Sequence, residues 1–321
     1  MQNASRLVLH LAQAARRRDP CAVTNALRAL AQHEEKKKGG GIAEHLHRLI
    51  PHGNAPGDDK ALKYLNEFTP QVRLDHLVLD NHVREACDEL VFEQRKCGLL
   101  EDAGLAPRSR VLLTGPPGNG KTSVGEAVAD ALGRPFYSVG YDTLTGSYLG
   151  ETGSRLRQVL DYVASHQCVV LFDEFEAIGK ERDDEHEVGE MKRTAASLLV
   201  QLERMPASTV IVAATNHPGM LDRATWRRFQ ITLELEGPDR AKLTEFFESR
   251  QRRSPGLRLD PGAAAATLDG ASYADAATLC DDVERQQVLH PEQDPDDLFR
   301  RRLARWAAAR RNHPQCPEQR R

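Results

Sequence analysis

The sequence predicts an α/β fold built on an open, doubly wound parallel sheet of five strands. Five short apolar runs alternate with helical stretches, namely RVLLT (110–114), RPFYSVG (134–140), CVVLFD (168–173), STVIVAATN (208–216) and QITLEL (230–235). Alternation of this kind is typical of a parallel sheet covered by helices on both faces. A glycine-rich motif follows the first run, and the region after the last run is helical again, which indicates an additional helical unit.

Helical segments are predicted on both sides of this sheet. Residues 1–50 space their apolar residues as helices do, and PHGNAPGDD (51–59) is typical of a linker. A helix over 80–98 places Val83, Cys87 and Leu90 on its buried side. We therefore expect four parts, listed here in order: an N-terminal helical domain with its linker (1–66), an α/β domain (67–236), a helical domain (237–312) and a flexible tail (313–321).

Composition indicates a soluble protein in a reducing, cytoplasmic setting. The formal net charge is −3 and 28% of the residues are charged, which argues against a chain that coats a polyanion. No apolar run approaches the ~20 residues that a membrane helix needs. The six cysteines form no C-x-x-C pair, so neither a disulfide framework nor a zinc site is expected.

The strongest motif is GPPGNGKT, which fits G-x-x-x-x-G-K-[ST] and lies between a predicted strand and a predicted helix. Its glycines let successive backbone amides point at phosphate oxygens, and the following helix directs its positive end there. We expect Lys121 to reach the β- and γ-phosphates and Thr122 to bind Mg²⁺. The predicted phosphate-binding residues are Gly115, Pro116, Pro117, Gly118, Asn119, Gly120, Lys121, Thr122 and Ser123.

Two acidic residues end the run CVVLFDE (168–174), at the edge where ligands of open α/β sheets bind. Asp173 is placed to hold Mg²⁺ through water, and Glu174 is placed to orient and deprotonate the attacking water. Alone, two adjacent acids at a strand end are also compatible with the start of a helix. Beside a phosphate-binding loop they indicate hydrolysis of a nucleoside triphosphate.

Polar residues at the end of the fourth run and just before the fifth run each allow two interpretations. Asn216 is either a contact to the γ-phosphate or the attacking water, or a turn residue before Pro218. Arg227 and Arg228 are either a surface basic pair or arginines that stabilise the transferring phosphoryl group. Their position near the start of the fifth strand favours action on a neighbouring subunit, as arginine fingers do.

Together, the motifs GPPGNGKT, VVLFDE, AATN, LDRATWRRF and GASYADAATLC resemble, in order and spacing, those of the AAA ATPases, which are P-loop NTPases. The resemblance covers about residues 75–290 and implies a Mg²⁺-dependent ATPase that assembles into a ring, in that family a hexamer. Asn216 would be the first sensor, and Arg227 and Arg228 the paired fingers. The family usually has R-P-G-R-F, so two residues are absent here, and we favour Arg228, which directly precedes Phe229.

The resemblance also implies a helical lid and a pore loop. SYAD (272–275) resembles the start of the lid helix, with the Ser272–Asp275 spacing of a capping box, and backbone near Ala274 would line the adenine pocket. Tyr273 replaces a glycine of the family. In SYLGETGSRLRQVL (147–160), Tyr148 and Leu149 resemble the aromatic–hydrophobic pair of the first pore loop. Judged from the residues alone, this pair could instead pack as a buried loop.

One further departure and one ambiguity concern communication within a ring. The family's D-G-F segment is not recognisable near LERMPAS (202–208), so signalling between subunits is expected to differ. The acidic segment 180–190 occupies the position of a second pore loop, or is a plain exposed loop.

We therefore expect an ATP-driven protein remodeller or unfoldase, with ATP and Mg²⁺ bound between the subunits of a homo-oligomer. The expected partners are a polypeptide client and a separate protease or adaptor recruited through the N-terminal helices, with no membrane. The alternative is a nucleic-acid motor or loader, which the basic segment FRRRLARWAAARR (299–311) would serve by contacting phosphates. A third hypothesis, an ATP-binding switch, conflicts with the catalytic carboxylate Glu174.

Overall fold

The computed structural model describes Leu30, residues 61–140, Leu144, residues 151–176 and residues 198–312. Most of the predicted N-terminal helical domain, Tyr148 and Leu149, the acidic segment 180–190 and the C-terminal tail lie outside these residues. The chain divides into two compact units, one made of residues 1–63 with 98–105 and the other of residues 64–97 with 106–321. The second unit contains the sheet, the predicted site and the C-terminal helices.

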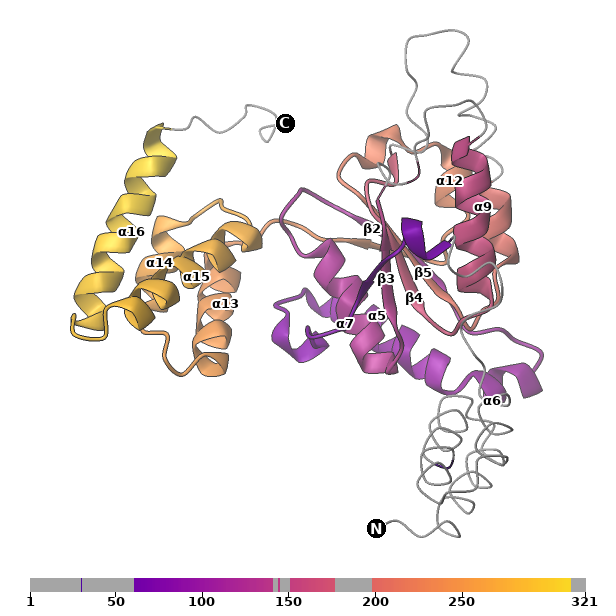
Figure 1. Cartoon of the computed structure of the whole chain (residues 1–321), viewed down its shortest axis with the longest axis horizontal. Coiled ribbons are helices and arrows are strands. Elements are labelled where there is room, and N and C mark those ends of the chain that lie inside the picture. The colour runs from indigo at the N-terminus through magenta and orange to yellow at the C-terminus, as the bar shows by residue number, and fades with distance from the viewer. Residues whose placement is uncertain (1–29, 31–60, 141–143, 145–150, 177–197, 313–321) are drawn as a thin grey trace, which may run out of the picture. The chain divides into compact units, whose positions relative to one another are not determined.

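The elements up to the last strand follow the predicted alternation (Figure 1). In chain order they are η1 (Leu62–Tyr64), β1 (Asn66–Phe68), η2 (Leu74–His76), α5 (Asn81–Arg95), α6 (Cys97–Asp102), β2 (Arg110–Thr114), α7 (Lys121–Leu132), β3 (Phe136–Val139), α9 (Glu151–Ala164), β4 (Val169–Phe172), β5 (Val210–Thr215), η3 (Pro218–Met220), α12 (Arg223–Trp226) and β6 (Ile231–Glu234). Residues 198–204 are also helical.

The sheet has the strand order β1-β3-β4-β5-β2-β6, and the last five of these strands are parallel. The predicted five-stranded parallel sheet is therefore confirmed. The structure adds β1, which pairs antiparallel with β3 at the edge of the sheet. All three residues of β1 are exposed, so this strand lacks the apolar pattern by which the sequence reveals a buried strand.

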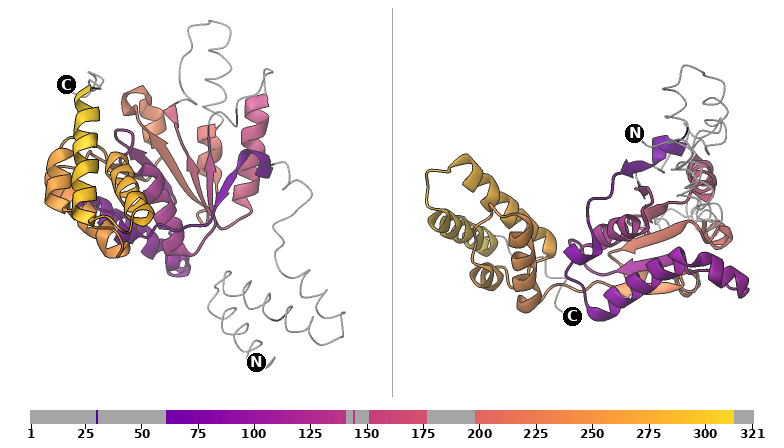
Figure 2. Two further views of the ribbon diagram at one scale, coloured as in Figure 1. Left: turned by 60° about the vertical axis from the view of Figure 1, so that its left-hand side comes forward. Right: turned by 90° about the horizontal axis from the view of Figure 1, so that it is seen from below.

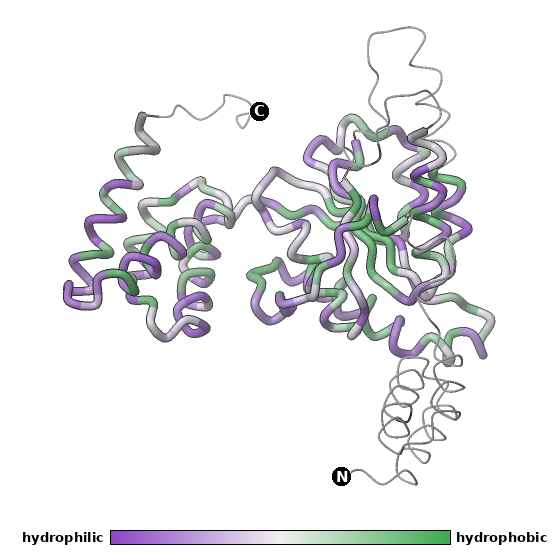
Figure 3. The backbone as a smooth tube through the Cα atoms, viewed as in Figure 1, coloured by the Kyte–Doolittle hydropathy of each residue, from purple (hydrophilic) through white to green (hydrophobic). Residues whose placement is uncertain are grey.

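Helices cover both faces of the sheet, as the doubly wound prediction requires. Figures 1 and 2 show α5 and α7 against one face and α9 against the other. Alternate residues of β3 point to opposite faces. Phe136 joins the core formed with α5 and α7, whereas the hydroxyl of Tyr137 lies 3.3 Å from that of Tyr162 on α9. In Figure 3, hydrophobic residues are concentrated in the strands of this sheet.

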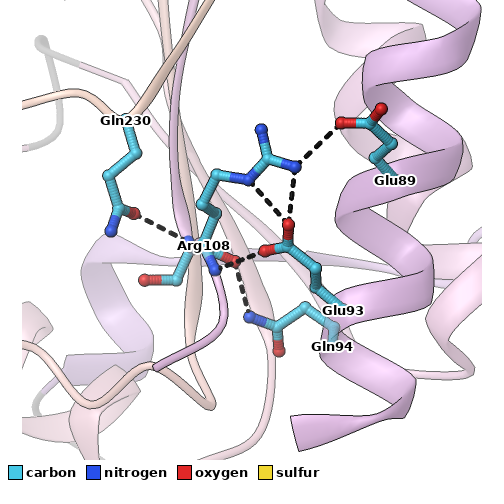
Figure 4. Close-up of polar contacts among 6 residues, drawn as sticks. Glu89, Glu93, Gln94, Arg108 and Gln230 are labelled. Atoms are coloured by element: carbon cyan, nitrogen blue, oxygen red, sulfur yellow. Dashed lines mark hydrogen bonds and ion pairs between the residues drawn. The ribbon is translucent and has the colours of Figure 1, made fainter. Parts of the chain in front are cut away.

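A polar network joins α5 to the beginning of the central strand β2 (Figure 4). The Arg108 guanidinium donates hydrogen bonds to Glu93 at 2.6 and 2.9 Å and to Glu89 at 2.9 Å. The side chain of Gln94 donates to the Arg108 carbonyl at 2.8 Å, and that of Gln230 accepts from the next amide at 2.9 Å. The hydrogen bond from Arg108 holds the pKa of Glu93 below its usual value. This network fixes the amino end of β2, opposite the end that carries the glycine-rich loop.

The C-terminal region forms a helical domain with its own core, which we call the lid. Its helices are α13 (Arg240–Arg253), α14 (Pro261–Thr267), α15 (Tyr273–Leu289) and α16 (Pro295–Asn312). Fully buried Leu243, Phe247 and Leu279 belong to this core. Asp239 and Asp260 cap α13 and α14 by accepting from backbone amides, as N-cap residues do. No helix among the described residues combines the length and apolar composition needed to cross a bilayer.

One close backbone contact fixes the loop after β2. Gly115 has φ +132°, and a Cβ built there would lie 2.2 Å from the carbonyl oxygen of Leu235, just beyond β6. A side chain at this position would therefore collide with backbone and also strain φ.

We expect Gly115→Ala to lower the free energy of unfolding by at least ~1–3 kcal/mol, because both the contact and the left-handed φ become unfavourable. Urea unfolding without nucleotide measures this change. Gly219→Ala is the matched control, since no atom lies within 4 Å of a Cβ built there. Equal unfolding midpoints for the two variants would contradict the contact.

Candidate nucleotide-binding site

The glycine-rich loop connects β2 to α7 at the carboxyl edge of the sheet. Gly115, Gly118 and Gly120 have φ values of +132°, +79° and +86°, a region that glycine adopts without steric cost. Helix α7 begins directly after them at Lys121. The first amides of a helix have no partner within it, and together with the helix dipole they form a site for an anion.

The Lys121 side chain lies folded over the loop that precedes it. Its amine donates to the carbonyl oxygens of Gly115 at 2.6 Å and Pro116 at 2.8 Å, and the residue is 7% exposed. Burial lowers the pKa of this amine, and the charges of Asp173 and Glu176 counter the shift. Lys121 is thus positioned beside the carboxylates that follow β4.

The two predicted acidic residues after β4, Asp173 and Glu174, differ in backbone conformation and in burial. The Asp173 amide donates to Val139 at 3.2 Å, and its side chain accepts from the Glu174 amide at 2.9 Å. Glu174 has φ +49°, the one positive value of a residue other than glycine among the described residues. Side chains rarely adopt this region, and such strain is concentrated at functional sites. The turn leaves Glu174 exposed, whereas Asp173 is partly buried.

A buried carboxylate, which the sequence analysis did not identify, lies beside the predicted sensor. Glu176 is 6% exposed, and one of its oxygens accepts from the Asn216 amide at 3.3 Å. Its other oxygen has no hydrogen-bond partner in the structure. The spacing D-E-x-E in the strand-end motif was the available signal, but only the structure shows that the third acid faces β5. Glu176 therefore positions the segment that carries Asn216.

A cavity of about 400 Å³ gathers most of the predicted site residues. The predicted residues in its lining are Pro117, Gly118, Asn119, Gly120, Lys121, Thr122, Ser123, Asp173, Asn216 and Ala274. Gly115 and Pro116 lie behind Lys121 and do not line it, and neither does the exposed Glu174. A volume of this size is typical of a small-molecule site.

The apolar part of the cavity comes from residues that the sequence analysis missed. Residues 76–79 and Phe246 line it together with Tyr273, and the Phe246 and Tyr273 rings lie 5.6 Å apart. The segment leading to 76–79 is held by Glu126 on α7, which accepts from the amides of Gln71 at 2.8 Å and Val72 at 3.1 Å. No local sequence signal predicts contacts between positions so far apart.

The start of α15, the third helix of the lid, touches the glycine-rich loop. The Ala274 amide donates to the Gly118 carbonyl at 3.0 Å, and a Cβ at Gly118 would lie 2.7 Å from the Ser272 hydroxyl oxygen. The predicted capping box is confirmed, since Ser272 accepts from the Asp275 amide at 3.2 Å and Asp275 accepts from the Ser272 amide at 3.0 Å. This contact sets the lid helix against the loop.

These residues fit a nucleoside triphosphate with Mg²⁺. A Cβ at Gly120 would meet no atom within 4 Å, so the cavity beside this glycine has room for a phosphate. Thr122 and Asp173 both line the cavity and supply the oxygen ligands that Mg²⁺ prefers. No group of three or more His, Cys, Asp or Glu side chains suited to a metal is found in the described part of the chain. Mg²⁺ at phosphate sites needs only one or two carboxylates besides the phosphates.

The two predicted arginines are not brought to this cavity. Arg227 follows α12 and is exposed, and Arg228 forms an ion pair with Glu203 of the same chain. Neither lines the cavity. The structure therefore gathers the glycine-rich loop, Asp173 and Asn216 around one cavity and leaves the arginine pair outside its lining.

Comparison with known proteins agrees with this geometry. Residues 111–236 match the family model described as "ATPase family associated with various cellular activities (AAA)". An uncharacterized AAA family ATPase of Sinorhizobium fredii is 31% identical over 273 residues, which cover 81% of this chain and 82% of that protein. Proteasome-activating nucleotidase 1 of Halobacterium salinarum is 32% identical, over 63% of this chain and 52% of its own length. The ATP-dependent zinc metalloprotease FtsH 1 of Salinibacter ruber is 31% identical, over 70% of this chain but 34% of its own length.

We expect Glu126→Ala to weaken nucleotide binding by roughly three- to tenfold. The substitution removes the hydrogen bonds that hold the segment leading to residues 76–79. Binding would then have to order this segment, and this ordering reduces the affinity. Titration of a fluorescent ADP analogue measures the effect. Glu126→Gln keeps an acceptor oxygen and should retain most of the affinity. Asp130→Ala, an exposed position on the same helix, is the control. Wild-type affinity in Glu126→Ala would show that the segment needs no such anchor.

Proposed function

This chain belongs to the AAA ATPase family and is an ATPase, and we propose that it is an ATP-driven protein remodeller whose active sites are completed by neighbouring subunits. The observation that carries the proposal is the division of the site. The phosphate loop, Asp173 and Asn216 meet around one cavity, whereas the arginine pair of the same chain lies outside its lining. A second copy that supplies its arginine would complete the site.

We propose a role for each of these residues. Lys121 and the amides at the start of α7 bind the phosphates, and Thr122 and Asp173 would hold Mg²⁺, which neutralises phosphate charge when bound. Glu174, exposed beside the cavity, takes the proton of the attacking water, and Asn216 orients that water or the γ-phosphate. An arginine of the adjacent subunit stabilises the charge that develops on the transferred group.

The protein client is proposed from relatives and from one loop. Relatives in the comparison are named proteasome-activating nucleotidase and ATP-dependent zinc metalloprotease, names that refer to protein breakdown. Tyr148 and Leu149 occupy the position of the first pore loop, although they lie outside the described residues. Apolar contact from such a loop would grip an extended polypeptide without reading its sequence.

We further propose a homohexamer, with residues 1–66 recruiting clients or an adaptor. A separate protease is the partner that we propose for any proteolysis, and the given sequence contains no H-E-x-x-H motif of zinc proteases. This chain spans about half of the nucleotidase and a third of the metalloprotease, so the activities of those whole proteins are not transferred to it.

The basic helix α16 gives less support to the nucleic-acid alternative. Arg300 pairs with Asp297 at 3.3 Å, and Arg302 pairs with Asp282 at 3.8 Å. Arg301 donates to the side chain of Gln293, and Trp306 packs on the lid core. These contacts of three α16 arginines within the lid favour a structural role over contact with a phosphate backbone. Stimulation of the ATPase by DNA that weakens with salt would reverse this preference.

We expect Glu174→Gln to bind ATP with near wild-type affinity but to hydrolyse it at least ~100-fold more slowly, because the attacking water loses its base. Phosphate release and nucleotide titration measure the two quantities. Glu85→Gln, an exposed carboxylate on α5, is the control. Wild-type turnover in Glu174→Gln would refute the assigned base.

We expect Tyr148→Ala to keep its basal ATPase activity and to lose its grip on clients, because the proposed pore contact is apolar and distant from the phosphates. In the Glu174→Gln background, pull-down with ATP and mass spectrometry would compare the captured proteins with and without this change. Undiminished capture in the double variant would end the pore-loop interpretation.

A further inference from the structure

The two arginines of the finger segment are adjacent in the chain, and this adjacency limits what they can do together. Arg227 is the C-cap of α12 with φ −66° and ψ −14°, so the turn remains helical there. Successive residues of a helical turn point about 100° apart and do not face each other. The two arginines of one copy therefore leave this turn in different directions, and their adjacency does not imply a shared role.

Arg228 is directed toward its own subunit. Its guanidinium forms the ion pair with Glu203, and its carbonyl accepts from the Arg110 side chain at 2.9 Å. The next residue, Phe229, is 8% exposed and packs edge-on against Phe175, with ring centres 5.6 Å apart. A partly exposed ion pair is weak by itself. The main-chain contact and the buried neighbour are what fix the direction of Arg228.

Arg227 has the opposite surroundings. It is exposed, and its side chain has no hydrogen bond or ion pair within the part of the chain that the structure describes. An exposed guanidinium on a short, capped helix is available to an anion outside its own subunit. Asp222 caps this helix by accepting from the Thr225 amide at 2.7 Å, so Arg227 is presented on a defined turn.

We propose that Arg227 is the arginine that reaches the phosphates bound by the neighbouring subunit, and that Arg228 is a positioning residue that anchors the segment through Glu203. This inference rests on the shared site of the proposed function. It reverses the expectation from sequence, which favoured Arg228 because it directly precedes Phe229.

The test compares four single variants by turnover and by affinity for a fluorescent ADP analogue. Arg227→Ala should reduce turnover by about 100-fold or more, as removal of an arginine finger does. Its affinity for the ADP analogue should stay within about twofold of the wild-type value, because the cavity that holds the nucleotide is intact. Arg228→Ala and Glu203→Gln should each lose only about two- to threefold, and their effects should not add in the double variant because they remove the same pair. Arg223→Ala, an exposed arginine on the same short helix, is the control.

Substitution of each arginine by lysine distinguishes a positioning role from a direct role at the phosphate. Arg228→Lys keeps the charge opposite Glu203 and should restore the turnover lost in Arg228→Ala. Arg227→Lys should stay impaired, because an ammonium cannot replace the planar guanidinium fork on a phosphoryl group. Mixing Arg227→Ala with Lys121→Ala subunits should give more activity than either alone, since the latter supply the missing arginine to intact cavities.

The outcomes distinguish the inference from the proposed function. If Arg228→Ala loses turnover as severely as Arg227→Ala, or alone does so, the division of roles is wrong while the shared site stands. If neither alanine variant loses turnover and mixing gives no recovery, the shared site itself is refuted.

Discussion

The glycine-rich loop is the constraint on which the described structure depends. It is confined on two sides, because a Cβ at Gly115 would collide with the carbonyl of Leu235 and a Cβ at Gly118 would collide with Ser272. The same loop meets the end of β6 and the start of the lid helix, where the Ala274 amide donates to Gly118. The glycine-rich loop is therefore in direct contact with the lid.

The proposed completion of the site by a second subunit is supported by the arrangement of elements. Strands β2, β4 and β5 end at one edge of the parallel sheet, so the groups at their carboxyl ends converge on one cavity. The arginine segment precedes β6 and belongs to the other end of that strand. The parallel sheet therefore separates Arg227 and Arg228 from the cavity of their own chain, and we propose that assembly brings an arginine to it.

The sequence predicted the sheet well because each parallel strand is buried on both faces and appears as a short apolar run. It predicted that the glycine-rich loop, Asp173 and Asn216 lie together, because each follows a strand and is marked by a compact motif. It missed β1, whose three residues are exposed, and it missed Phe246 and residues 76–79, which reach the cavity through contacts distant in sequence. Glu176 was overlooked because adjacency to Asp173 and Glu174 does not reveal which acid turns inward. The orientation of the Arg228 side chain depends on its ion pair with Glu203, and the sequence did not predict it because no motif links those two positions.

The central claim is that ATP is consumed only where two copies of the chain meet. The most direct measurement is the specific ATPase activity across a dilution series, with molar mass determined by light scattering at each concentration under saturating nucleotide. The account predicts that activity per subunit rises with the assembled fraction and falls toward zero for the monomer. A strictly monomeric preparation that hydrolyses ATP at the full rate would contradict it.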